Sequence, residues 1–266
     1  MVLGDFFKKH SQEIPNNEAL VFKERRITFK QYDEATDRVA MGLLKLGVKR
    51  GDRIAIYGPL WPEIVFAYFG AAKIGAIGVP MSARTTAPEL KFFVNDSESS
   101  VLFMPSTFMG GDFMANLDAV REEMPTLKHV VCFDLEKEGV LLWEKFLTDP
   151  DPAVLNKAKD AVQEDDSALF IYTSGTTGVP KAAQLTHKNL IALTNAQIEA
   201  TGYHRGHIIV LNLPFSHVGG AVMGIICNVN VGNKVVMMDA FNPEETLRLV
   251  SEEKATTLGQ VPAMYA

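Results

Sequence analysis

The feature that most constrains the fold is a regular alternation of short apolar runs with longer stretches of helical spacing. The runs at 53–57, 76–79, 101–104, 130–133, 168–172, 208–213 and 234–238 predict strands. The stretches at 29–47, 62–75, 88–95, 113–123, 141–147, 188–200, after residue 217 and at 243–254 predict helices. We therefore expect an α/β fold, with one or more open twisted, mostly parallel sheets flanked by helices.

The domain organisation follows from the same pattern. Residues 149–167 are rich in aspartate and glutamate and contain two prolines, which predicts a solvated connection. We expect one subdomain over residues 50–200 and a second formed by residues 1–49 together with 205–266. Ligands of open parallel sheets bind in crevices at the carboxyl ends of the strands, so we expect a ligand-binding site in the loops at those ends.

Charge and composition exclude several classes of protein. The chain of 266 residues has a formal net charge of −6, which argues against a nucleic-acid-binding protein. The N-terminus lacks the apolar segment of a signal peptide. The uncharged stretch from Ile208 to Asn233 is interrupted by prolines, asparagines and a glycine pair, so we expect buried elements rather than a transmembrane segment. Cys132 and Cys227 stand in apolar runs and are expected to be buried free thiols.

A glycine- and hydroxyl-rich loop follows the strand expected at residues 168–172. It contains Thr173, Ser174, Gly175, Thr176, Thr177 and Gly178, and it ends with Pro180 and Lys181. Glycines let a backbone approach an anion closely, and successive N–H groups of such a turn form an anion-binding nest. The hydroxyl donors and the charge of Lys181 suit a polyphosphate, so these residues favour a triphosphate-binding loop.

Two better-known phosphate motifs are absent. A Walker A loop needs G-x-x-x-x-G-K-[ST], but Pro180 stands five positions after Gly175 and Ala182 follows Lys181. There is no G-x-G-x-x-G either. The residues by themselves leave a polar structural turn as an alternative to a phosphate site.

The segment Tyr-Thr-Ser-Gly-Thr-Thr-Gly-Val-Pro-Lys at 172–181 resembles the phosphate-binding signature of the AMP-forming, adenylate-forming superfamily, which includes the acyl-CoA synthetases. Residues 51–80 are similar to the family's upstream block, and 213–220 resemble the segment whose histidine borders the acyl pocket. Residues 259–265 resemble the family's next Val-Pro block. The stretch 208–254 is most similar to fatty-acid–CoA ligases.

The chain departs from the family pattern in two ways. The family usually has glycine where Ala182 stands, and we expect this change to have a modest effect on the exit of the loop. The family's later segments for adenine, ribose and magnesium, and its mobile C-terminal domain with a catalytic lysine, have no counterpart in these 266 residues. We therefore expect residues 1–266 to form an incomplete N-terminal domain of the acetyl-CoA synthetase-like fold.

The resemblance implies ATP, Mg²⁺ and CoA as the small molecules of the complete enzyme. It implies that the loop residues hold the ATP phosphates, that Lys181 neutralises their charge, and that His217, Gly219 and Gly220 border the acyl substrate. It leaves the metal ligands unknown, with a loop hydroxyl as the one candidate. An isolated histidine in an apolar run is more often a core residue, and His204 with His207 form an incomplete zinc set that we expect to be a surface turn.

The implied reaction is ATP-dependent activation of a carboxylic acid, chiefly a fatty acid, to acyl-AMP and then to acyl-CoA, with release of pyrophosphate and AMP. We expect this piece alone to be inactive. The alternative is a non-catalytic nucleotide- or acyl-binding module. We expect a cytoplasmic protein, with peripheral membrane association as a further option, and apolar surface that favours a homodimer.

Overall fold

The computed structural model describes residues 1–173 and 179–264. Its helices are α1 Leu3–Glu13, α2 Phe29–Lys45, α3 Pro62–Lys73, α4 Ala87–Ser97, α5 Phe113–Val120, α6 Trp143–Phe146, α7 Pro152–Asp160, α8 His187–Thr201, α9 Cys227–Val231 and α10 Pro243–Glu252. A π-helical segment, η2, spans Gly219–Ile226, and 3₁₀ turns span Arg121–Glu123 and Pro262–Met264.

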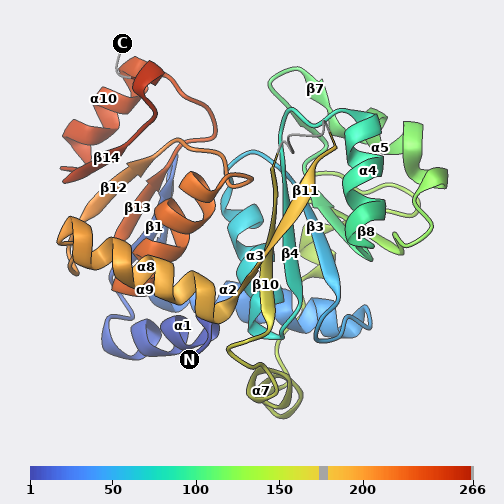
Figure 1. Cartoon of the computed structure of the whole chain (residues 1–266), viewed down its shortest axis with the longest axis horizontal. Coiled ribbons are helices and arrows are strands. Elements are labelled where there is room, and N and C mark those ends of the chain that lie inside the picture. Colours follow the sequence, from blue (N-terminus) through green and yellow to red (C-terminus); the bar gives the residue numbers. More distant parts are fainter. Residues whose placement is uncertain (174–178, 265–266) are drawn as a thin grey trace.

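The strands belong to two large sheets and one small hairpin (Figure 1). The strands are β1 Glu18–Phe22, β2 Arg25–Thr28, β3 Arg53–Gly58, β4 Ile77–Ser82, β5 Val101–Met104, β6 Thr107–Phe108, β7 Gly111–Asp112, β8 His129–Cys132, β9 Leu141–Leu142, β10 Ser167–Thr173, β11 Lys181–Thr186, β12 Ile208–Leu211, β13 Lys234–Met237 and β14 Thr257–Gly259. The sheet orders are β11-β10-β4-β3-β5-β8-β9 and β14-β12-β13-β1-β2, and β6 pairs with β7.

The expected fold class is confirmed. All pairs within the two large sheets are parallel except β1–β2 and β10–β11, and helices cover the sheets (Figure 1). The seven-stranded sheet draws its strands from residues 53–186, and the five-stranded sheet from residues 18–28 and 208–259. The division into subdomains at residues 50 and 200 stays a prediction.

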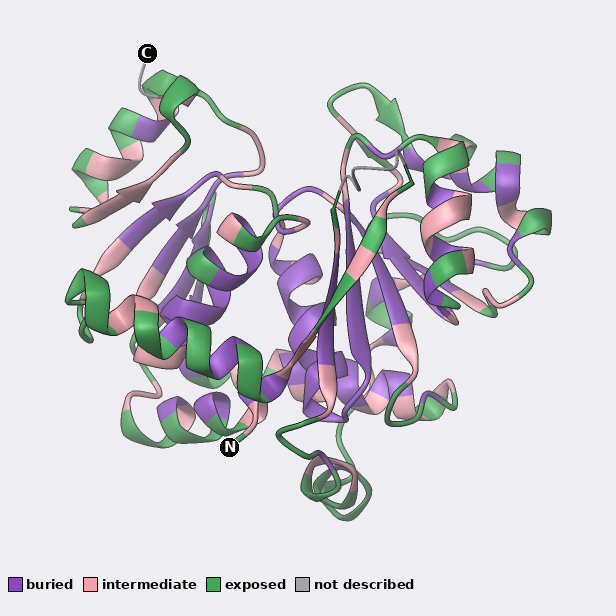
Figure 2. Cartoon of the chain, viewed as in Figure 1, coloured by how far each residue is buried: buried purple, intermediate pink, exposed green. Residues whose placement is uncertain are grey.

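Helix α3 is the most deeply buried element. Every residue of α3 except Glu63 is buried, and Figure 2 shows the purple core running through the middle of the molecule around it. Helices α1 and α2 pack on α3 from one side, and strands β3 and β4 pack on it from the other. A helix that is apolar all round is typical of the interior of a protein of this size.

Two expectations about the middle of the chain are correct only in part. Residues 149–167 contain helix α7, because Asp151 caps its first turn through the backbone N–H groups of Ala153 and Val154, and Leu155 is buried against the core. Most of α7 is exposed, so its composition looks like that of a loop. Residues 141–147 contain strand β9 followed by the single turn α6, because residues 141 and 142 pair with β8.

The expectations about apolar segments are confirmed. The uncharged stretch from Ile208 to Asn233 forms β12, a turn, η2 and α9. No helix in the described part of the chain is long and apolar enough to cross a membrane. Cys132 and Cys227 are buried and free.

His187 is a buried histidine at the start of α8. Its Nδ1 atom accepts a hydrogen bond from the backbone N–H of Leu3 at 3.2 Å, which ties the beginning of α8 to the beginning of α1. Its Nε2 atom is buried and has no partner among the described residues. Burial lowers the pKa of His187 to about 4, so the folded chain keeps this imidazole neutral at pH values where an exposed histidine is protonated.

This burial predicts a loss of stability in mild acid. Between pH 6.5 and about 4 the unfolded chain takes up a proton at His187 while the folded chain does not, so the free energy of unfolding falls as the pH falls. The contribution reaches about 3 kcal/mol at the lower limit. Urea unfolding of the unaltered chain and of His187→Gln at several pH values measures it, and the variant should show the smaller pH dependence.

The control is His204→Gln, which alters an exposed histidine and should leave the pH dependence as it is in the unaltered chain. Burial also lowers the pKa of His10, but His10 is present in all three proteins and cancels from the comparison. Equal pH dependence in all three proteins would contradict the assignment to His187.

Candidate functional site

Strands β10 and β11 form the antiparallel hairpin that carries the expected phosphate loop. Thr173 and Lys181 are opposite each other at its end, and the Thr173 hydroxyl donates to the Lys181 carbonyl at 3.5 Å. The loop residues Ser174, Gly175, Thr176, Thr177 and Gly178 lie outside the described residues. The structure therefore places the two ends of the loop side by side and assigns its interior no geometry.

Lys181 is an exposed cation without an acidic neighbour. No carboxylate in residues 1–173 and 179–264 lies within ion-pair distance of its ammonium group. The Thr173 side chain, which follows the last buried positions of β10, is exposed as well. An unpaired ammonium group and a hydroxyl at the same hairpin end are available to a ligand that carries negative charge.

The hairpin ends at the carboxyl edge of the seven-stranded sheet. Strand β10 runs parallel to β4, with Leu169 opposite Gly78, so its last residue points the same way as the ends of β3 and β4. In Figure 1 this edge lies at the top of the view. Open α/β sheets bind ligands outside this edge, which agrees with the place of Lys181.

The segment that resembles the acyl-pocket block lies at the carboxyl edge of the other sheet. Strand β12 is parallel to both of its neighbours, and it is followed by a turn that leads into η2. In this turn the His217 N–H donates to the Pro214 carbonyl at 3.1 Å, and the Ala221 N–H donates to the His217 carbonyl at 2.8 Å. The His217 side chain is exposed to solvent.

Gly220 has a packing role in this turn. A Cβ atom at Gly220 would lie 2.2 Å from the Pro214 carbonyl oxygen and 2.7 Å from the Leu213 carbonyl oxygen, so only glycine fits against this backbone. At Gly219 a Cβ atom would come 3.3 Å from Leu213 Cδ1, which is tight but not prohibitive. The glycine pair thus lets the first turn of η2 pack on the preceding loop, which explains the motif without a ligand.

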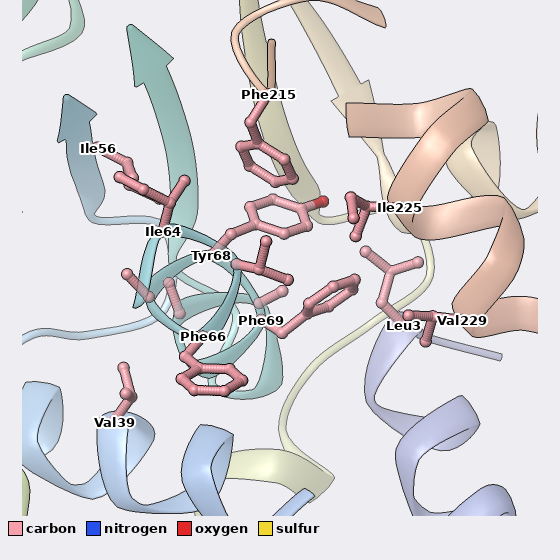
Figure 3. Close-up of a cluster of buried hydrophobic side chains, with 14 of the residues drawn as sticks. Leu3, Val39, Ile56, Ile64, Phe66, Tyr68, Phe69, Phe215, Ile225 and Val229 are labelled. Atoms are coloured by element: carbon pink, nitrogen blue, oxygen red, sulfur yellow. The ribbon is translucent and has the colours of Figure 1, made fainter. Parts of the chain in front are cut away.

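Phe215 fixes the turn to the rest of the molecule. Its ring is buried and meets the ring of Tyr68 edge to face, with centroids 5.3 Å apart. Figure 3 shows Tyr68 of α3 directed toward Phe215 and Ile225, which belong to the turn and to η2. The turn before His217 is therefore held against the central helix by an aromatic contact.

Asn212 is a candidate that the sequence analysis did not select. It follows β12 directly, is 7% exposed, and neither side-chain amide atom has a hydrogen-bond partner within the described ranges. A buried amide without a partner is costly, and this one lies at the ligand-binding edge of a parallel sheet. The available signal was an asparagine at the end of an apolar run, where a strand interior would disfavour it.

The described residues offer no metal centre. Within residues 1–173 and 179–264 no three His, Cys, Asp or Glu side chains are grouped so that they could hold a metal ion. His204 and His207 have ring centroids 4.4 Å apart beside the turn at Arg205–Gly206, and no third ligand of these kinds joins them there. We therefore assign Mg²⁺ no ligand from these residues.

Comparison with known proteins defines the class. The profile of the family described as AMP-binding enzyme matches residues 7–266. The chain therefore belongs to this family, and the adenylate-forming class indicated by the loop motif is confirmed. The matching profile covers both the β10–β11 hairpin and the turn that contains His217.

Individual relatives agree with this assignment. The fatty acid–[acyl-carrier-protein] ligase ScoC of Streptomyces coeruleorubidus is 31% identical over 96% of this chain and 47% of its own length. The medium-chain fatty-acid–CoA ligase of Escherichia coli is 26% identical over 99% of this chain and 47% of its own length. The chain spans about half the length of the curated relatives that it matches.

Among solved structures, the N-terminal domain of FACL13 from Mycobacterium tuberculosis is similar to this chain. Its TM-score is 0.87 at 28% identity, over 99% of this chain and 63% of that one. The architecture of two mostly parallel sheets is thus shared with the N-terminal domain of an adenylate-forming ligase.

The packing of Gly220 predicts the effect of a single added methyl group. Gly220→Ala should lower the free energy of unfolding by about 2 kcal/mol, because the new Cβ atom must displace the Pro214 backbone. Thermal and urea unfolding measure this change. Gly4→Ala, in helix α1, is the control. A Cβ atom at Gly4 would meet only Lys73 Cγ, at an ordinary contact distance of 3.6 Å, so the free energy of unfolding should be unchanged or slightly higher. Equal stability of the two variants would contradict the packing role.

Proposed function

We propose that this chain is part of an AMP-forming ligase that activates a fatty acid. The observation that carries the proposal is the unpaired Lys181 at the end of the β10–β11 hairpin, at the carboxyl edge of the sheet, within the family signature. In the first step a carboxylate oxygen bonds to the α-phosphorus of ATP, and the bond to pyrophosphate breaks. In the second step the thiol of CoA takes the acyl group and AMP leaves.

The task of this chain in the first step is to position and neutralise the polyphosphate. The proposed ligands are Thr173, Ser174, Gly175, Thr176, Thr177, Gly178 and Lys181. The ammonium group of Lys181 offsets the negative charge that pyrophosphate gains as it leaves, and the hydroxyls of Thr173 and its neighbours donate to phosphate oxygens. Positioning and charge account for most of the catalysis of such transfers.

The acyl end of the site is proposed at the turn after β12. We assign His217, Gly219 and Gly220 to its border, with His217 as the polar side chain and the glycines as the backbone that lets η2 approach. The two relatives named above act on fatty acids, which supports that substrate class. A π-helical segment next to the turn agrees with this assignment, because such segments are frequent at functional sites.

We further propose that the 266 residues alone do not complete the reaction. The relatives use about twice this length, and the alternative for the short chain is a module that binds nucleotide or acyl group without turnover. Incubation with ATP, CoA and a medium-chain fatty acid should yield no acyl-CoA above the Lys181→Ala level by mass spectrometry. Product that depends on Lys181 would overturn this proposal. The expected homodimer stays a prediction.

The phosphate site is tested by ATP binding. The expected result is saturable binding by the unaltered chain in a calorimetric titration, weakened about tenfold or more by Lys181→Ala, because a charge-assisted contact to phosphate contributes about 1.5–3 kcal/mol. Ser174→Ala should weaken binding by a smaller factor, because it removes one neutral donor.

Lys188→Ala is the matched control for charge. Lys188 is an exposed lysine near the same hairpin, on α8, where its ammonium group lies 3.6 Å from carboxylate oxygens of Glu164 and Asp165. Its removal also deletes one positive charge and should leave ATP affinity unchanged within twofold. No binding by the unaltered chain at millimolar ATP, or equal losses in Lys181→Ala and Lys188→Ala, would contradict the proposed site.

A further inference from the structure

The end of the β10–β11 hairpin has little backbone support from the rest of the sheet. Strand β10 is paired with β4 at Leu169 and Gly78, near its beginning. Its later residues, from Phe170 to Thr173, pair with β11, which is the edge strand of the sheet and is largely exposed. The half of the hairpin that presents Lys181 therefore depends on side-chain contacts for its position.

Tyr172 makes such a contact. Its hydroxyl donates to Asp96 Oδ2 at 2.6 Å, across 76 positions of sequence. Its ring lies against Phe93 and Phe92, with centroid distances of 4.7 and 6.2 Å. Asp96, Phe92 and Phe93 all belong to α4, so Tyr172 links the hairpin end to this helix by one hydrogen bond and an aromatic contact.

Helix α4 is itself held in place by a capped N-terminus, buried side chains and a hydrogen bond to a neighbouring segment. Its N-terminus is capped, with the Thr86 N–H donating to Glu89 Oε2 at 2.8 Å. Leu90 and Val94 are fully buried in the core beneath it, and the Asn95 amide donates to the Glu123 carbonyl at 2.9 Å. A hairpin end attached to α4 therefore takes its position from the body of the protein.

The hydrogen bond between Tyr172 and Asp96 requires a protonated phenol. A carboxylate is a strong acceptor, and a phenol that donates to it forms a charge-assisted bond. Burial, together with the neighbouring Asp96 carboxylate, raises the pKa of Tyr172 well above its usual value. The Tyr172 hydroxyl thus remains a donor throughout the physiological range.

We propose that Asp96 is a positioning residue for the phosphate-binding hairpin, acting through the Tyr172 hydroxyl to fix where Thr173 and Lys181 are presented. This inference rests on the proposed function, because it assumes that Lys181 meets a polyphosphate. Asp96 is not one of the proposed ligands: it is hydrogen-bonded to the hairpin at Tyr172, one residue before Thr173. Asp96, the proposed positioning residue, therefore lies on helix α4, outside the signature at residues 172–181.

The experiment uses Tyr172→Phe, Asp96→Ala, the double variant and Asp96→Asn, with two measurements on each. The first is the ATP dissociation constant from titration. The second is amide hydrogen exchange of the hairpin end, residues 170–173 and 181–184. Glu123→Gln is the matched control, because it removes an exposed ion pair of the same helix, 2.8 Å to Lys91 Nζ, without touching the hairpin.

Loss of the link should raise the ATP dissociation constant about threefold to tenfold in Tyr172→Phe and in Asp96→Ala. The double variant should be no weaker than the weaker single variant, because both changes delete one hydrogen bond. Exchange at the hairpin end should become faster in the same variants. Asp96→Asn should retain most of the ATP affinity of the unaltered chain, because its amide oxygen can still accept a hydrogen bond from the phenol. Glu123→Gln should bind ATP within twofold of the unaltered chain.

The two measurements separate this inference from the proposed function. Exchange at the hairpin end that stays unchanged in Tyr172→Phe and Asp96→Ala would overturn the positioning role, whatever happens to ATP. Faster exchange with unchanged ATP affinity would overturn it too, because the contact would then be structural only. If the unaltered chain binds no ATP, the proposed function fails, and the assumption on which this inference rests fails with it.

Discussion

The burial of helix α3 between the two sheets is the constraint on which the rest of the structure depends. Close approach requires small residues: a Cβ atom at Gly70 would lie 2.4 Å from Val39 Cγ1 of α2, and one at Gly78 would lie 2.5 Å from the Tyr68 ring. The same ring meets Phe215, so the helix contacts both β4 and the turn after β12 (Figure 3). The turn after β12 and strand β4 therefore both pack on the same buried helix.

The polar end of α3 completes this arrangement. Lys73 is 3% exposed, and its ammonium group is paired with Asp33 and, at 2.6 Å, with Asp37 of α2. Lys159 of α7 also reaches Asp37, at 2.8 Å. Buried charges are tolerated only when paired, and this cluster of ion pairs connects α2, α3 and α7. The Lys159 ion pair adds to the Asp151 cap and the buried Leu155 that hold α7 in place.

The alternation of strands and helices could be predicted because each element carries its own periodicity. Helices α2 and α3 and strands β5 and β10 follow from local pattern alone. Strand β14 and the antiparallel edge strands β2 and β11 could not be predicted in this way, because they are short or exposed and form where a neighbour offers backbone groups. Likewise the single turn of α6 is too short to show a helical period.

The candidate site likewise has one part that the local sequence predicts and another that depends on the fold. The glycine- and hydroxyl-rich segment is a motif of consecutive residues, so the sequence is sufficient to predict Thr173 and Lys181 as site residues. The partners that give those residues a position are remote in sequence. Asp96 stands 76 positions before Tyr172, and the backbone that requires glycine at position 220 belongs to Leu213 and Pro214, so only the fold shows either contact. A signature thus identifies what a site can bind, whereas its orientation depends on contacts that only the fold brings together. In the proposed site, the apolar interior supplies the rigidity that the edge strand β11 lacks. Tyr172 contributes to this link, because its ring packs on Phe93 of α4 while its hydroxyl is hydrogen-bonded to Asp96.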